Sequence, residues 1–300
     1  MSSRLVVIFN EDYSRNIPVL EKIYGPRFKD RVYIVPDHFS RLEPLYQGSK
    51  VSRQLLWSGE RIYHSLRRLI GRKNRHEVSA IDCPKSLIRI VGNKWYFQHF
   101  ISQAREMILS NHAEWYWFLG DDVLLNPCID ESNILGFLSV PEGAKVVLCR
   151  PEPKPDGWVS WFQRSSDECR GLLRNLLNAE GMEEAARNLD SAPLFGACSD
   201  FFGVHREVLS RVCDAFERSA RMGLFVEIAV PAILGVPENA PHFIDSYTWD
   251  FDSDRGSVPK LDAFWADPAH VFYHPCKLSD RNVANRVVSH YAEQRPEACT

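Results

Sequence analysis

The sequence of 300 residues has no uninterrupted apolar segment of about 18 residues, the length that a transmembrane helix requires. Its first apolar run, Leu5–Phe9, is too short for the core of a signal peptide. The eight cysteines include no CxxC pair, which disfavours a zinc knuckle and indicates reduced thiols. The formal net charge of −3 argues against the dominant basic surface of a nucleic-acid-binding protein. These absences predict a cytoplasmic protein that binds no nucleic acid.

Short apolar runs, typical of buried strands, alternate with segments of helical periodicity in the first half of the chain. Strands that alternate with helices predict an α/β fold with a mainly parallel central sheet flanked by helices. We expect strands at 5–9, 32–35, 78–81, 115–119 and 145–149, and helices at 14–24 and 93–110.

The rest of the chain has a less regular pattern. We expect helical segments at 166–189, 207–222 and 225–234, a strand and turn at 194–204 and an irregular segment at 237–275. Segment 41–76 is polar and basic, and we expect an insertion that is partly helical over 54–70. This insertion is either a solvated surface or a contact with an anionic partner such as a phosphate or a membrane headgroup.

Two adjacent carboxylates, Asp121 and Asp122, follow the apolar strand expected at 115–119. Ligands of open α/β sheets bind outside the carboxyl ends of the strands. Adjacent carboxylates repel each other unless a cation lies between them, and a nucleotide diphosphate supplies further oxygen ligands to a hard divalent cation. An Asp-rich turn or a helix N-cap is the structural alternative.

This stretch resembles the short acidic metal-binding motif of GT-A fold glycosyltransferases, in which a hydrophobic strand ends in Asp-x-Asp or a relative of it. The form here is Gly120-Asp121-Asp122, without the first Asp. Three later segments resemble the same family in order, at 196–209, around Glu227, and at 272–279.

The resemblance implies a GT-A-like, Rossmann-like fold in a single domain over residues 1–300. Residues 1–150 would form the nucleotide-sugar-binding half, and residues 151–300 the acceptor and catalytic half with a C-terminal acceptor-side subregion.

The resemblance also implies the ligands of a metal ion and of the donor. Asp122 and His274 would bind Mn²⁺ or Mg²⁺, and Asp121 would contact the metal through water or contact the donor sugar. Lys277 would contact the diphosphate. Asn10 and Asp82, which follow expected strands, would hold the nucleotide base and ribose.

The resemblance implies that Glu227, at an expected helix start, is the first candidate for the general base of an inverting mechanism. Its place in an apolar segment is consistent with a pKa raised by burial. Asp200 is the alternative base, or it binds sugar hydroxyls. An aromatic acceptor platform is expected from four side chains, which core packing would explain equally well: Trp249, Phe251, Trp265 and Tyr273.

The expected function is a metal-dependent glycosyltransferase for surface polysaccharide biosynthesis. It would move a sugar from a nucleotide-diphosphate donor, with UDP-sugar favoured by the family, to a hydroxyl of a glycan or lipid-linked acceptor. Residues 53–75 would contact the inner face of the membrane peripherally. A sugar nucleotidyltransferase and a non-catalytic GT-A-like binding protein are the alternatives, although residues 10–15 lack the Gly-rich loop of the former.

Overall fold

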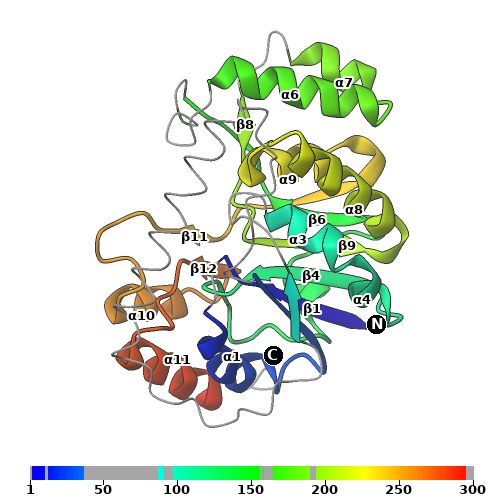
Figure 1. Ribbon diagram of the computed structural model, residues 1–300. Coiled ribbons are helices and arrows are strands. Elements are labelled where there is room, and N and C mark those ends of the chain that lie inside the picture. Colours follow the sequence, from blue (N-terminus) through cyan, green and yellow to red (C-terminus); the bar gives the residue numbers. More distant parts are fainter. Residues whose placement is uncertain are drawn as a thin grey trace, which may run out of the picture.

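The computed structural model describes residues 2–10, 13–36, 87–90, 97–155, 158, 165–189 and 194–294. Its centre is a seven-stranded sheet in the spatial order β10-β6-β9-β4-β1-β2-β3 (Figure 1). The strands are β1 (Ser3–Ile8), β2 (Asp30–Pro36), β3 (Leu87–Ile90), β4 (Trp115–Gly120), β6 (Val146–Cys149), β9 (Phe201–His205) and β10 (Pro241–Ile244). Only β9 runs antiparallel to its neighbours among these seven described strands. The prediction of a mainly parallel α/β sheet is confirmed.

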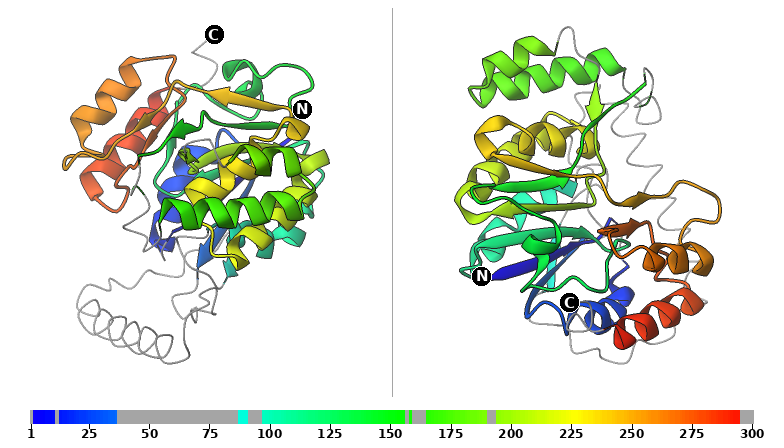
Figure 2. Two further views of the ribbon diagram at one scale, coloured as in Figure 1. Left: turned by 90° about the horizontal axis from the view of Figure 1, so that it is seen from above. Right: turned by 180° about the vertical axis from the view of Figure 1, so that it is seen from behind.

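Helices cover both faces of this sheet, as the views in Figure 2 show. The alternation of β1 explains why, because Val6 and Ile8 enter one apolar core while Leu5 and Val7 enter the other. The first core contains side chains of α3 (Phe97–Gln103), α6 (Ser166–Ala179), α8 (Arg206–Arg221) and α9 (Val226–Leu234). The second contains side chains of α1 (Ile17–Tyr24), α10 (Val258–Ala266) and α11 (Arg281–Glu293). The shorter described helices are η1 (Ser14–Asn16), α4 (Arg105–Leu109), α5 (Ile134–Phe137), α7 (Glu183–Asn188) and η5 (Pro237–Asn239).

The antiparallel strand β9 is fixed against β4 by a glycine. Gly203 pairs with Trp117, and a Cβ atom at Gly203 would lie only 2.4 Å from the Trp117 ring. The Trp117 ring also stacks on Phe201, with 5.9 Å between ring centroids. A side chain at position 203 would therefore displace this indole and the strand pairing with it.

A second, smaller sheet folds the C-terminal region back onto the end of β4. It has the order β11-β12-β5, formed by β11 (Thr248–Trp249), β12 (Phe272–His274) and β5 (Leu124–Leu125). The backbone N–H of Cys276 donates to the carbonyl of Asp122 at 2.6 Å. A third sheet has two strands, β7 (Glu152–Pro153) and β8 (Phe195–Gly196).

Several sequence-based expectations differ from the structure. The segment 237–275 is not irregular, since it contains β10, β11, α10 and β12. The helix expected at 93–110 is interrupted at Ala104, and the one expected at 166–189 is two helices separated by a turn at Gly181. The strand β3 was not predicted. The expected strand at 78–81 and the basic segment 41–76 lie outside the described residues.

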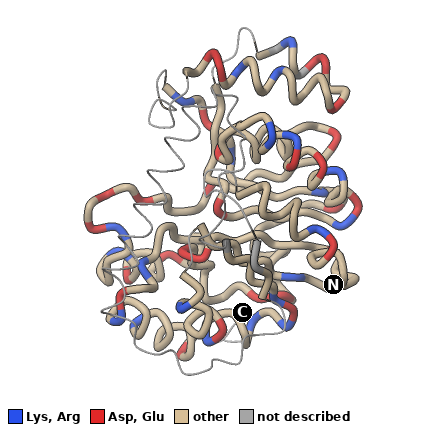
Figure 3. The backbone as a smooth tube through the Cα atoms, in the orientation of Figure 1, with Lys and Arg blue, Asp and Glu red and all other residues tan. Residues whose placement is uncertain are grey.

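Two further observations concern the distribution of charge and the apolar character of the helices. Basic and acidic residues are interspersed along the described backbone (Figure 3). No helix among the described residues combines the length and the apolar character needed to cross a membrane.

Five described cysteines are free and buried: Cys149, Cys169, Cys198, Cys213 and Cys276. Cys128 is disulfide-bonded, so the prediction of eight reduced thiols is wrong at this residue.

Candidate active site

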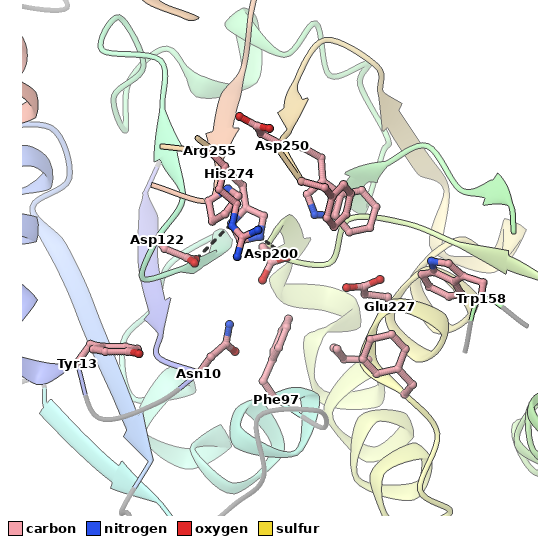
Figure 4. Close-up of a pocket in the computed structure, with 15 residues that line it drawn as sticks. Asn10, Tyr13, Phe97, Asp122, Trp158, Asp200, Glu227, Asp250, Arg255 and His274 are labelled. Atoms are coloured by element: carbon pink, nitrogen blue, oxygen red, sulfur yellow. Dashed lines mark ion pairs between the residues drawn. The ribbon is translucent and has the colours of Figure 1, made fainter. Parts of the chain in front are cut away.

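A cavity of about 560 Å³ opens beside the carboxyl ends of β1 and β4. The strand order reverses between these two strands, because β2 continues the sheet beyond β1 and β9 continues it beyond β4. Open α/β sheets bind ligands at such a point. The cavity is lined by Asn10, Tyr13, Phe97, Asp122, Trp158, Asp200, Phe225, Val226, Glu227, Trp249, Asp250, Phe251, Arg255, His274 and Pro275 (Figure 4).

The imidazole of His274 lies between two carboxylates. Its Nδ1 atom is 3.3 Å from Oδ1 of Asp122, and its Nε2 atom is 3.4 Å from Oδ2 of Asp200. Burial alone would lower the pKa of His274, but the carboxylates of Asp200 and Asp122 raise it well above its usual value. Burial also raises the pKa of Asp200, against the opposing effect of His274. The structure thus brings together three residues that sequence analysis had assigned to separate segments.

Gly120 allows the two carboxylates to approach each other. A Cβ atom there would lie 3.3 Å from Oδ1 of Asp122 and 3.4 Å from the Cβ of Asp200. The backbone N–H of Gly120 donates to the carbonyl of Asp200 at 2.8 Å. The glycine at the end of β4 therefore sets the spacing of both acids around His274.

Asp121 has a different environment from Asp122. Its side chain is 3% exposed and does not line the cavity. Its carboxylate accepts a hydrogen bond from the backbone N–H of Asn10, and its own backbone N–H donates to the carbonyl of Ile8 at 3.0 Å. Burial and the neighbouring Asp122 raise the pKa of Asp121 well above its usual value. Asp121 joins the ends of β1 and β4, and its predicted contact with metal or donor stays a prediction.

The donor set around His274 fits a divalent cation. Oδ1 of Asp122 and Nδ1 of His274 are both buried, and neither has a hydrogen-bond partner in the described part of the chain. Their 3.3 Å separation is close to the roughly 3 Å between adjacent ligands of an octahedral ion with bonds of about 2.1 Å. No group of three or more His, Cys, Asp or Glu side chains among the described residues could hold a metal ion. Two protein ligands would therefore leave positions for phosphate oxygens or water.

Glu227 lies in the first turn of α9, with its position fixed by the segment before β9. Its carbonyl accepts from the backbone N–H of Ala197 at 3.1 Å, and the hydroxyl of Ser199 donates to the carbonyl of Val226 at 3.3 Å. Burial raises the pKa of Glu227 from 4.5 to about 8, and the nearby Asp200 contributes in the same direction. The Glu227 carboxylate forms no hydrogen bond or ion pair with a described side chain, so it can accept a proton from a ligand.

Arg255, which was not predicted as a site residue, enters the cavity from a loop. The loop is held by Lys260, whose ammonium lies 2.9 Å from Asp250, 2.6 Å from Asp252 and 3.0 Å from Asp254. Gly256 ends the loop with a φ of +70°, and a Cβ there would lie 2.9 Å from the carbonyl oxygen of Pro275. In the sequence, the alternating acids Asp250, Asp252 and Asp254 are the feature from which this loop could have been identified.

The structure places some of the remaining predicted site residues at the cavity and others away from it. Lys277 is exposed and does not line the cavity, although its Cγ atom lies beside Gly256.

Trp249 and Phe251 reach the cavity, whereas Trp265 stacks on His290 with 3.9 Å between ring centroids. Tyr273 is buried, and its hydroxyl donates to Asp250 at 2.6 Å. Asn10 lines the cavity, and Asp82 lies outside the described residues. Four lining aromatics were not predicted: Tyr13, Phe97, Trp158 and Phe225.

Comparison with known proteins gives only distant likenesses. No protein-family model and no curated protein matches the sequence. Among solved structures, a glycosyltransferase involved in glycosylation of the major capsid of PBCV-1 is 13% identical, with a TM-score of 0.41 over 98% of this chain and 100% of that one. Mouse xyloside xylosyltransferase 1 is 11% identical, with a TM-score of 0.35 over 93% of this chain and 99% of that one. Core-mannan synthase A from Aspergillus fumigatus, in its Mn/GDP form, is 11% identical, with a TM-score of 0.37 over 81% and 73%. All three TM-scores are below 0.5, so these likenesses do not establish a function for this chain.

Proposed function

We propose that this protein is a metal-dependent glycosyltransferase that uses a nucleotide-diphosphate sugar. The observation that carries the proposal is the convergence of Asp122, Asp200, Glu227 and His274, from four separate segments, on one cavity at the reversal of the strand order. Among the described residues, four carboxylates line the cavity (Asp122, Asp200, Glu227 and Asp250) with two basic side chains, His274 and Arg255. A site with this excess of acid favours a ligand that arrives with a divalent cation.

The positions of the lining residues support one orientation of the donor in the cavity. In the view of Figure 4, Tyr13 and Asn10 lie below Asp122 and His274, and Glu227 lies on the side away from Tyr13. The nucleoside, with UDP favoured by the family resemblance, would lie against Tyr13 and Asn10. Arg255 would pair with the diphosphate, with Lys277 near the rim as a second cation. Asp122 and His274 would hold Mn²⁺ or Mg²⁺, which when bound offsets the charge that develops on the leaving diphosphate.

Glu227 is the proposed general base. The acceptor hydroxyl would give its proton to the Glu227 carboxylate while its oxygen bonds to the anomeric carbon. The bond from that carbon to the diphosphate oxygen breaks, and its electron pair leaves with the diphosphate, which inverts the anomeric centre. Asp200 is the weaker candidate for the base, because its Oδ2 atom already lies beside His274 and accepts from the thiol of Cys198. Asp200 would bind hydroxyls of the donor sugar.

The acceptor is proposed to be a hydroxyl of a glycan or of a lipid-linked glycan. Trp249 and Phe251 line the cavity together with Glu227, and their ring centroids are 4.9 Å apart. Aromatic faces of this kind provide flat apolar surfaces on which sugar rings pack. A role in surface polysaccharide biosynthesis belongs to the same proposal.

Calorimetry of UDP binding tests this function. We expect the wild type to bind UDP with Mn²⁺ and to lose binding in EDTA, and the Asp122→Ala variant to bind weakly under both conditions. Asp262→Ala is the matched control, because Asp262 is an exposed acid that pairs with Arg286. Absence of binding to UDP, GDP, CMP and dTDP would contradict the proposal and favour a non-catalytic binding protein. Exchange of pyrophosphate into a nucleoside triphosphate would instead indicate a sugar nucleotidyltransferase.

A further inference from the structure

A second cavity of about 380 Å³ adjoins the first one. The two share three aromatic side chains, Trp158, Trp249 and Phe251. The residues that line only the second cavity are Arg150, Glu152, Lys154, Asp245 and Tyr247. Both cavities exceed the lower limit of about 300 Å³ for small-molecule sites. A ligand that passes the shared aromatic wall would therefore occupy both.

Lys154 fixes the two indoles of the shared wall. Its Nζ atom lies 5.3 Å from the ring centroid of Trp158 and 5.2 Å from that of Trp249. The Lys154 side chain is only 12% exposed, and its backbone N–H donates to the carbonyl of Leu194 at 2.8 Å. Trp158 in turn packs over Gly196, where a Cβ atom would lie 2.9 Å from the indole. The wall therefore presents two indole faces that contact the same ammonium group.

The polar groups of the second cavity are balanced in charge. The Arg150 guanidinium forms a bidentate pair with Asp245, at 2.6 and 2.9 Å, and Lys154 lies 3.7 Å from the carboxylate of Glu152. Arg150 and Asp245 are both more than half exposed, so their remaining donors and acceptors can reach a ligand. Tyr247 completes the lining and stacks on Phe272, with 5.0 Å between ring centroids. Paired charges and aromatic faces suit a neutral ligand with many hydroxyls better than a phosphate or an acyl chain.

We propose that the second cavity binds the sugar residues that precede the attacking ring of the acceptor, so that the acceptor is an oligosaccharide chain of at least two rings. This inference rests on the proposed function. The attacking ring would lie beside Glu227 in the first cavity, and the chain would cross the wall of Trp158 and Trp249. A single sugar or a bare lipid alcohol would leave the second cavity unused.

The test compares saccharide length and uses calorimetry on the full chain loaded with UDP and Mn²⁺. The probes are glucose, mannose and N-acetylglucosamine, each with its disaccharide and trisaccharide. We expect at least one series in which the disaccharide or trisaccharide binds about tenfold more tightly than its monosaccharide. The Arg150→Ala variant should lose that gain and keep the affinity for the monosaccharide. Trp249→Ala should weaken both.

Matched controls come from a second arginine that repeats the environment of Arg150. Arg286 pairs with Asp262 at 2.8 Å and lies over Trp265, just as Arg150 pairs with Asp245 and lies over Phe243. Arg286→Ala and Trp265→Ala should behave as the wild type. Equal binding of all lengths, failure of every saccharide to bind, or a gain that Arg150→Ala retains would overturn the inference. Binding of UDP with Mn²⁺, measured in the same titrations, would still support the donor site and so separates this failure from that of the proposed function.

Discussion

Oδ1 of Asp122 and Nδ1 of His274 face each other at 3.3 Å, and neither has a hydrogen-bond partner among the described residues. The two atoms form a buried ion pair that is longer than a charge-assisted hydrogen bond, and a cation between them would bind both. The first atom comes from the end of β4 and the second from the end of β12, which the small sheet folds back onto it.

This relationship predicts coupling in metal binding. Asp122→Ala and His274→Ala should each weaken Mn²⁺ binding by at least about tenfold, as loss of a ligand does. The double variant should be little weaker than either single variant, since both side chains would hold one ion. Electron paramagnetic resonance of free Mn²⁺ measures these affinities. Fully additive losses would indicate that the two residues act separately.

The raised pKa of Glu227 predicts how glycosyl transfer depends on pH. Its raised pKa of about 8 means that the base is largely protonated at pH 7. The kcat/KM should therefore rise with pH and level off above about 8, and Glu227→Gln should lower kcat by about 10²- to 10⁴-fold. Release of UDP measures the rate, with Glu238→Gln as the control. A flat pH profile in the wild type would argue against Glu227 as the base.

The same carboxyl group should make the protein less stable at alkaline pH. Below the ordinary pKa of 4.5 the group is protonated in both the folded and the unfolded chain, whereas between 4.5 and about 8 only the folded chain retains the proton. Stability contributed by that proton is lost as the pH rises through this window. Glu227→Gln should raise the free energy of unfolding by about 2 kcal/mol at pH 8, after allowance for partial exposure, and by much less at pH 4. Urea unfolding at the two pH values checks the difference.

Lys260 should position the loop that carries Arg255. Lys260→Met would leave the three carboxylates of Asp250, Asp252 and Asp254 without their common cation, and their repulsion would displace the loop. We expect weaker UDP binding in calorimetry and a lower melting temperature. Lys29→Met is the control, because the Lys29 side chain is 92% exposed and its ion pair with Glu131 is a long one, at 3.5 Å. Unchanged UDP binding in Lys260→Met would contradict a positioning role.

Gly203 offers a test of the packing that supports the site. Gly203→Ala would force a Cβ atom to 2.4 Å from the Trp117 ring, and we expect a loss of about 1–3 kcal/mol in the free energy of unfolding. Gly171, in α6, is the matched control because a Cβ atom there would meet no heavy atom within 4 Å. Gly171→Ala should be neutral or stabilise by up to about 1 kcal/mol, since alanine favours the helix. Equal effects of the two substitutions in urea unfolding would contradict this packing.

The parts of the fold that were predictable are those whose sequence pattern is local. The continuous apolar runs of β1 and β4 indicated buried parallel strands, and the acids after β4 indicated the edge where ligands bind. Glu227 was noticeable as an acid in an apolar segment, and that segment begins α9 as expected.

The parts that were not predictable depend on partners distant in the sequence. Only Ile244 of the four residues of the edge strand β10 is fully buried, so no apolar run marked it. The sequence offered no reason to prefer Arg255 over Lys277 as the contact of the diphosphate. The position of Arg255 depends on Lys260 binding three acids and on Gly256 packing against Pro275. Trp249 lines the cavity and Trp265 does not. This difference likewise depends on α10 packing beside α11, which no local pattern specifies.

A crystal grown with UDP and Mn²⁺ tests the central claim most directly, through the anomalous scattering of manganese. The account predicts one strong anomalous peak within about 2.3 Å of both Oδ1 of Asp122 and Nδ1 of His274, with the diphosphate next to Arg255 and the nucleoside toward Tyr13 and Asn10. UDP bound elsewhere, or bound in this cavity with no manganese between Asp122 and His274, would contradict it.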